Sequence, residues 1–238
     1  MKFTYLWVDF FTVIIPFLFS FHPKLSFHRN FRYFFPANVL AAIFFLSWDV
    51  LFTGMKVWGF NPDYISGIHF FNLPIEEVMF FLCVPFSCVF SYHCLNLHFN
   101  ISWKPKTESV FVVIFSSILL ITGLVFFSRL YTSVTFISLA LLLLFLKYKM
   151  KVIWLPKLFT IYPILLIPFF IVNGILTGTG LDAPVVWYNN AENLGIRMLT
   201  IPIEDTFYGF ELILLNVFFY EYLKGKSNPE MVKAEVIQ

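Results

Sequence analysis

The sequence predicts an all-α integral membrane protein with seven transmembrane helices. The 238-residue chain is 59% hydrophobic and 13% charged, has a mean hydropathy of +0.81 and contains 34 phenylalanines. Soluble globular proteins carry about 25% charged residues, so this composition excludes the ordinary soluble classes. Seven apolar stretches come close to the ~20 residues that a bilayer requires. They lie near residues 3–21, 36–53, 74–95, 108–127, 131–147, 158–177 and 199–222.

The first apolar stretch is expected to be a retained helix. One basic residue precedes it, Asp9 and Pro16 interrupt it, and no small-residue cleavage site follows it. A secretory signal peptide needs such a cleavage site, so this segment is counted with the spans.

The basic residues alternate between the two sides of the predicted bundle. Twelve of the 16 lysines and arginines follow the first, third, fifth and seventh stretches. Cytoplasmic loops carry an excess of Lys and Arg. The pattern therefore predicts an outside N-terminus, a cytoplasmic C-terminus and a multi-pass location in the cytoplasmic membrane. No basic tract suggests nucleic acid.

A proline-acid motif occurs twice, as "PIEE" at 74–77 and "PIED" at 202–205. A tryptophan precedes each proline by fifteen or sixteen residues, and a basic residue precedes each by five. These are Trp58 and His69 in the first case, and Trp187 and Arg197 in the second. We therefore predict an internal duplication of a three-helix unit.

Three helices are an odd number, so a spare helix is needed to keep the two copies parallel. This predicts a 3+1+3 parallel repeat, in which a shared site lies where the copies face each other. The expected divisions are a first repeat at 1–100, a linker helix at 101–130, a second repeat at 131–223 and a disordered cytoplasmic tail at 224–238.

Four acids, Glu76, Glu77, Glu204 and Asp205, follow the two prolines. One interpretation is structural: Pro favours the first position of a helix, and acids in the first turn suit the helix dipole. The other is functional, because the flanking segments are apolar and a carboxylate in hydrocarbon costs several kcal/mol. Four carboxyls in one apolar pocket cannot all ionise, and together they would supply a general acid and a general base.

Other polar and aromatic residues are candidates for binding substrate or tuning the acids. Asp49 either joins the acidic cluster or pairs with Lys56 or His69. Asn173 either contacts a carboxylate or makes an ordinary interhelical hydrogen bond. The remaining candidates are His69 and Arg197, which either tune the acids or form salt bridges, Trp58 and Trp187, which also suit an interfacial belt, and Tyr208.

Several chemistries lack their signatures. The chain has no G-x-G-x-x-G fingerprint, no pair of aspartate-rich motifs for Mg²⁺-diphosphate and no second histidine at a metal-ligand spacing from His69. No cofactor and no metal site is therefore predicted. Cys83, Cys88 and Cys94 match no metal or redox spacing and are expected to be apolar fillers.

The segments "PIEEVMFF" and "GIRMLTIPIEDTFYGF", with Trp-Gly-Phe-Asn at 58–61, resemble the heterodimeric-type lycopene cyclases, here in fused form. The resemblance covers nearly the whole chain except the tail. It implies cyclisation of the ψ ends of lycopene to β rings, through γ-carotene to β-carotene, with no net redox change. It also implies that lycopene and other linear carotenoids are substrates, beside membrane lipid and other carotenoid-pathway enzymes as partners.

The resemblance carries the catalytic role to Glu76, Glu77, Glu204 and Asp205, with Glu76 or Glu204 favoured as the proton donor. Two alternatives stay open. The carotenoid 1,2-hydratases share the scaffold and begin with the same protonation, and small proton-coupled transporters share the 3+1+3 layout. The sequence does not decide whether the repeats share one pocket or own one each.

Overall fold

The computed structural model describes residues 2–99 and 101–227 and is built from α-helices. The α-helices are α1 (Thr4–Phe19), α2 (Phe31–Gly54), α3 (Ile75–His98), α4 (Pro105–Val125), α5 (Leu130–Leu144), α6 (Leu155–Leu176) and α7 (Ile203–Ser227). A 3-10 turn precedes α2 (η1, Phe27–Asn30), another lies in the connection between α2 and α3 (η2, Pro62–Tyr64), and a π-helical turn extends α5 (η3, Phe145–Lys149). All seven predicted helices are therefore present.

Among the described residues, five helical segments are long and apolar enough to cross a membrane by length and composition. They are Phe27–Gly54, Ile75–His98, Pro105–Val125, Leu130–Lys149 and Leu155–Leu176. The helix α1 is apolar but has only 16 residues. The helix α7 carries acids along its length, and those at 204, 205 and 211 are buried inside the protein. This architecture is that of a membrane protein.

Several helix boundaries differ from the sequence prediction, among them the start of α2, which lies at Phe31 rather than near 36, and both ends of α7. The seventh helix begins at Ile203, because residues 197–202 form a hairpin in which Pro202 pairs with Arg197. At the other end, α7 continues through Ser227, so the tail that was expected to be disordered from 224 starts as helix. The rest of that tail, 228–238, lies outside the described residues.

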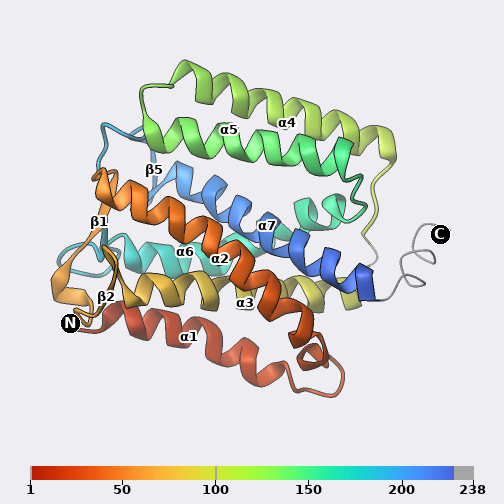
Figure 1. Cartoon of the computed structure of the whole chain (residues 1–238), viewed down its shortest axis with the longest axis horizontal. Helices are drawn as coiled ribbons and strands as arrows, with labels where there is room; N and C mark the ends of the chain where they lie inside the picture. The colour runs from red at the N-terminus through yellow and green to blue at the C-terminus, as the bar shows by residue number, and fades with distance from the viewer. Residues whose placement is uncertain (1, 100, 228–238) are drawn as a thin grey trace.

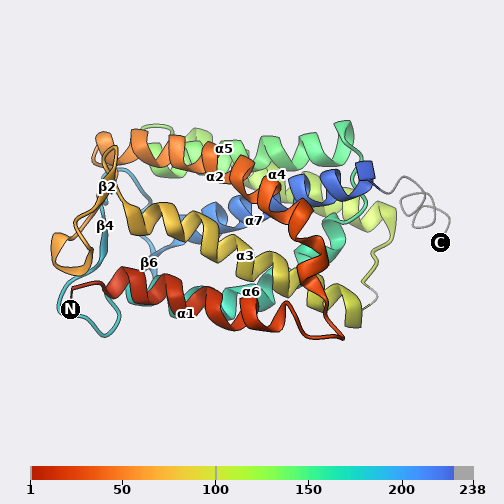
Figure 2. The same ribbon diagram turned by 60° about the horizontal axis from the view of Figure 1, so that its bottom comes forward.

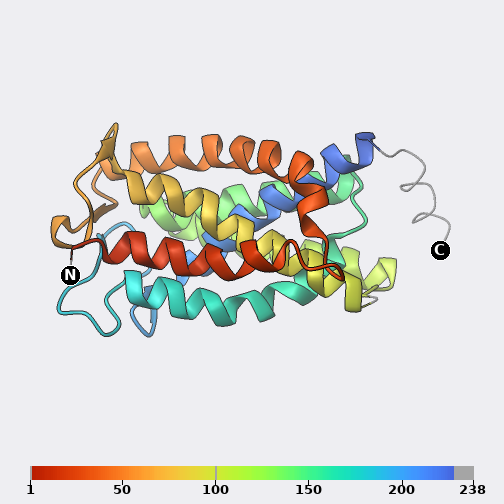
Figure 3. The ribbon, with the colours of Figure 1, turned by 90° about the horizontal axis from the view of Figure 1, so that it is seen from below.

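The helices run along one common direction (Figure 1). The pair α4 and α5 lies on one side of the bundle and α1 on the other, with α2, α3 and α7 between them. Figure 3 shows α1 and α6 side by side. The first residues of α3 and α7 therefore lie inside the bundle, at one end of it.

Six short strands are described in this chain. They are β1 (Trp58–Phe60), β2 (His69–Phe70), β3 (Leu73–Pro74), β4 (Val186–Tyr188), β5 (Arg197–Met198) and β6 (Ile201–Pro202). Those labelled in Figure 2, β2, β4 and β6, lie at this end of the bundle. The hairpin β2–β3 leads into α3 and the hairpin β5–β6 leads into α7. Strands β1 and β4 pair antiparallel and so join the two halves of the chain across the start of both helices.

Candidate active site

Both acidic motifs begin a helix. Pro74 and Pro202 close a hairpin, and α3 and α7 start at the next residue, so the acids occupy the first helical turn as the structural interpretation predicts. The acids are nevertheless buried, with exposed fractions of 0% for Glu76, 8% for Glu77, 0% for Glu204 and 5% for Asp205. They are thus not solvated carboxylates at a membrane surface.

The first acid of each motif holds the loop ahead of its helix. Glu76 accepts the backbone N–H of Ser66 at 2.6 Å, and Glu204 accepts the backbone N–H of Leu194 at 2.7 Å. Glu204 also accepts the Thr132 hydroxyl at 2.6 Å. Because each accepts a backbone N–H from ten residues back along the chain, these carboxyls fasten the loops to the helix starts.

The second acid of each motif turns toward tyrosines and a cavity. Tyr5 donates to Glu77 Oε2 at 2.5 Å. Tyr131 and Tyr188 donate to the two oxygens of Asp205 at 2.5 Å and 2.9 Å. Glu77 and Asp205 both line one cavity of about 1020 Å³, whereas Glu76 and Glu204 do not. The structure therefore places one acid from each half of the chain in the same cavity.

A third carboxyl, Asp49 of α2, lines the same cavity and is 1% exposed. It accepts the indole N–H of Trp58 at 2.5 Å, while its other oxygen has no hydrogen-bond partner among the described residues. Of the alternatives left open by the sequence, Asp49 joins the acids. Lys56 and His69 are both exposed, and neither forms an ion pair with Asp49.

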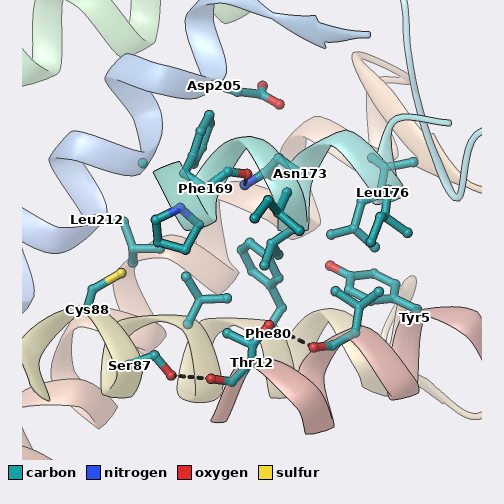
Figure 4. A pocket seen from close by; sticks show the side chains of 18 of the residues that line it. Tyr5, Thr12, Phe80, Ser87, Cys88, Phe169, Asn173, Leu176, Asp205 and Leu212 are labelled. Carbon is teal, nitrogen blue, oxygen red and sulfur yellow. Dashed lines mark hydrogen bonds between the residues drawn. The ribbon is translucent and has the colours of Figure 1, made fainter. Parts of the chain in front are cut away.

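Aromatic rings surround the acidic end of the cavity. The ring centroids of Trp58 and Tyr131 lie 5.0 Å apart, those of Tyr131 and Tyr188 are stacked at 5.9 Å, and those of Trp58 and Tyr208 lie 6.1 Å apart. All four rings line the cavity. Beyond them the walls come from α1, α3, α6 and α7 and are mostly apolar, as the labelled Leu176, Phe80 and Leu212 illustrate (Figure 4). The site is a set of carboxyls at the aromatic end of an apolar chamber.

A family model described as "Lycopene cyclase" matches the chain twice, at residues 2–95 and 128–223. The two matches cover most of the sequence, and each contains one of the acidic motifs. The chain belongs to the lycopene cyclase family. Membership implies an enzyme that catalyses cyclisation and acts on carotenoid substrates. No curated protein and no solved structure matches this chain.

In this member of the lycopene cyclase family, some of the other predicted site residues line the cavity and some lie outside it. Trp58, Tyr208 and Asn173 line the cavity, although the Asn173 amide contacts only the Phe169 carbonyl, at 3.5 Å, among the described residues. Trp187 is 40% exposed, packs over Gly59 and lies outside the lining.

The two basic residues ahead of the motifs lie on the hairpins rather than in the cavity. His69 is exposed, and its Nδ1 lies 3.0 Å from the Gly67 carbonyl oxygen. Arg197 donates to the Thr200 carbonyl at 2.7 Å, and its guanidinium lies 5.8 Å from the centroid of the Tyr188 ring. Neither forms an ion pair with the acids among the described residues.

Sequence reasoning missed the tyrosines that bind the acids. Tyr5 and Tyr131 stand at the same place in the first helix of each repeat, "FTYLW" and "RLYTS", and this correspondence was the signal that could have found them. Asp9, one helical turn after Tyr5, is 0% exposed and lies close enough to interact electrostatically with Glu77.

Tyr188 of β4, like Trp58 of β1, belongs to the site but lies outside the helices. Burial, followed by the nearby Asp205 carboxylate, raises the pKa of its phenol well above the usual value. Tyr188 therefore keeps its proton near neutral pH and stays a donor to Asp205.

Proposed function

We propose that this protein is a lycopene β-cyclase. It converts the ψ end groups of lycopene to β rings, giving γ-carotene and then β-carotene, by acid-base chemistry without a redox step. The observation that carries this proposal is that Glu77 and Asp205, one from each half, line the same apolar cavity together with Asp49. Family membership supplies the substrate class.

Glu77 is proposed as the proton donor and Asp205 as the base. Asp205 receives two phenol O–H donors, which a carboxylate needs because it can only accept hydrogen bonds. Glu77 interacts electrostatically with both Asp205 and Asp49. Carboxyls crowded in an apolar surrounding cannot all ionise, so this group shares at least one proton. Glu77, which interacts with both of the others, is proposed to deliver it.

The reaction adds one proton and later removes one. Protonation at C2 of the terminal alkene leaves a tertiary cation at C1. The C5–C6 double bond supplies the electron pair for a new C1–C6 bond, and the cation moves to C5. Asp205 then takes the proton from C6, and its electron pair forms the C5–C6 double bond of the β ring. The product is an isomer of the substrate, so no oxidant or reductant is consumed, and the protein is an isomerase.

The aromatic end of the cavity suits the cationic intermediate. The faces of Trp58, Tyr131, Tyr188 and Tyr208 attract a cation through their ring quadrupoles, by about 2 kcal/mol or more when water is excluded. A dry chamber favours ring closure, whereas a water beside C1 would give a hydroxylated end group. The burial of all three acids supports the dry case.

Glu76 and Glu204 are assigned a positioning role, in place of the donor role that the sequence favoured for them. Each accepts a backbone N–H of the preceding loop and lies outside the cavity lining. By fastening the hairpin, each fixes the first turn of its helix and so the direction of the next acid.

The sidedness of the protein is also a proposal. The excess of basic residues after alternate helices supports an outside N-terminus, a cytoplasmic C-terminus and a 3+1+3 parallel repeat in the cytoplasmic membrane. The acidic site then lies toward the outer leaflet. The linker helix is α4, within the expected 101–130 segment.

Expression in a host that accumulates lycopene tests the function, with pigments separated and identified from the membranes. Cyclic product bearing β rings is the expected result. Hydroxylated acyclic product would assign the protein to the hydratases instead, and unchanged lycopene beside abundant folded protein would favour a carrier.

A further inference from the structure

From the acids, the cavity extends mainly along the helices. From Glu77 it follows α3 as far as Ser91, fourteen residues along, which is about 21 Å at the 1.5 Å rise of a helix. Pro16 of α1 and Leu165 of α6 lie toward the same far end. The acids stand at the opposite end, where α3 and α7 begin. The cavity is therefore a long groove with its chemistry at one end.

The duplication would place an equivalent groove on the other side, beside α2 and α5, but bulky side chains fill that space. The segments DVLFTG at 49–54 and NGILTG at 173–178 align α2 with α6. In this alignment Val172 and Leu176, which line the groove, correspond to Trp48 and Phe52. Both aromatic residues are buried, and their ring centroids lie 5.6 Å apart.

The helices that carry the acids, α3 and α7, also differ in the volume of the side chain at a corresponding position. Gly209 of α7 lines the groove, and a Cβ added there would come within 3.3 Å of the ring of Phe169. The corresponding residue of α3, 128 positions earlier, is Phe81, which is 1% exposed and stacks on Phe45 at 6.0 Å. Gly209 thus leaves space for the groove beside α1 and α6, whereas Phe81 fills the equivalent space beside α2 and α5.

The linker helix α4 packs against α5, one of the helices of the filled side. It lies against α5 on the face of the bundle away from α1 (Figure 1), and Gly123 allows the close approach, since a Cβ there would come within 2.8 Å of Ile137. Lys147, in the π-helical turn after α5, forms an ion pair of 2.8 Å with Glu108 of α4.

The groove side is open instead. Phe11 and Ile15 of α1 and Ile171 of α6 line the groove, yet they are 64%, 62% and 61% exposed. These residues define the mouth of the groove. The mouth lies on the outer surface of apolar helices at the α1–α6 face (Figure 3), so in a membrane it meets lipid.

We infer that the protein has a single substrate groove, which a linear polyene enters sideways from the bilayer between α1 and α6 and which treats one end of the molecule at a time. This inference rests on the proposed function. The two end groups lie at opposite ends of an extended chain, so only one can reach Glu77 and Asp205. The half-cyclised product has to leave through the mouth and return reversed before its second end can react.

A time course in membranes containing the full chain, supplied with lycopene, tests the order of events. Free monocyclic product is expected first, and it should exceed bicyclic product at low conversion. Excess isotopically labelled lycopene, added at the monocyclic maximum, should compete for the groove and sharply slow bicyclic formation from the unlabelled intermediate.

Bicyclic product that forms from the start without free monocyclic product, and that labelled lycopene does not slow, would overturn the inference and leave the cyclase function standing. Absence of any cyclic product would overturn the proposed function itself. The two failures are therefore distinct.

A matched pair of variants tests the mouth. Ile171→Trp narrows the mouth, while Ile121→Trp makes the same change on α4, outside the cavity lining, at a residue of nearly the same exposure, 62% against 61%. Ile171→Trp is expected to lower lycopene consumption about tenfold, equivalent to ~1.4 kcal/mol, and Ile121→Trp to leave it unchanged. Equal rates in the two variants, at equal membrane levels and thermal stability, would overturn a mouth between α1 and α6.

Discussion

The two halves of the chain, 2–95 and 128–223, build the same parts and use them differently. Each has a hairpin that enters a helix, an acid that accepts a backbone N–H 10 residues back along the chain, and a second acid bound by a tyrosine of the half's first helix. Those tyrosines are Tyr5 and Tyr131. The duplication thus supplies one acid from each half, Glu77 and Asp205, to the same cavity.

The halves differ in the helix that should border the groove. In the first half Trp48 and Phe52 of α2 are packed in the core, and in the second Val172 and Leu176 of α6 line an open space. A few side-chain volumes therefore convert a duplicated scaffold into an asymmetric enzyme. The predictions below alter matched positions in the two halves, in descending order of expected effect.

The largest effect is expected where adjacent acids have different roles. Glu77→Gln removes the proposed proton donor and should slow lycopene consumption about a thousandfold, within the usual range for general acid-base groups. Glu76→Gln keeps an oxygen that can accept the Ser66 N–H and should stay close to the wild-type rate. Pigment conversion at equal membrane levels measures both variants.

The second half offers the same contrast. Asp205→Asn should lose activity and Glu204→Gln should retain it. A loss that falls on Glu76 and Glu204 while Glu77 and Asp205 tolerate substitution would reverse the assignment of roles.

The next effect concerns the volume of the groove. Val172→Trp gives α6 the residue that α2 has and should reduce cyclisation roughly a hundredfold, because overfilling a site costs about 1–3 kcal/mol and ~1.4 kcal/mol is tenfold. The reverse change, Trp48→Val, empties a packed site and should lower the free energy of unfolding by about 3 kcal/mol.

Conversion rate and thermal stability, measured on both variants, separate the two effects. If Val172→Trp keeps full activity, the polyene does not occupy the space beside α6.

A smaller effect is expected from the tyrosines. Tyr131→Phe removes one of two donors to Asp205 and should slow the reaction about thirtyfold, since a hydrogen bond to a charged group contributes about 1.5–3 kcal/mol. Tyr33→Phe, at a buried ring outside the cavity lining, is the control and should leave the rate unchanged. A wild-type rate in Tyr131→Phe would show that Asp205 does not depend on this donor.

The smallest effect is expected at Tyr208, whose counterpart in the first half is Phe80. The Tyr208 hydroxyl is buried and has no hydrogen-bond partner among the described residues. Tyr208→Phe keeps the ring and removes a buried hydroxyl that makes no hydrogen bond. The melting temperature should therefore be equal or higher, and the rate should stay within about twofold of the wild-type rate. A fall of several degrees would reveal a partner for this hydroxyl.

The helices and the acids could be read from the sequence for physical reasons. A bilayer demands long apolar segments, and carboxylates are costly inside them, so both features leave a clear pattern in the chain. Pro74 and Pro202 stand one residue before α3 and α7, as the structural interpretation of the motifs indicated, whereas the apolar stretch placed the start of the seventh helix near 199. The repeat of "PIEE" and "PIED" likewise identified the helices that carry the acids.

The division of labour between neighbouring acids could not be read in this way. Glu76 and Glu77 are adjacent and chemically identical, and they differ because successive helical residues point about 100° apart. One direction leads to the loop and the other to the cavity. Which direction is which depends on how α1, α6 and the hairpins pack around the helix start.

By itself, the sequence determined a membrane-embedded helical duplication with paired acids, because hydrophobicity and repetition are local properties of a chain. Only the tertiary structure decided that Glu77, Asp205 and Asp49 share one chamber, that His69 and Trp187 stay outside its lining, and that Trp48 fills the space opposite Val172. Such outcomes depend on the volumes and directions of side chains from distant segments, which become neighbours only when the helices pack.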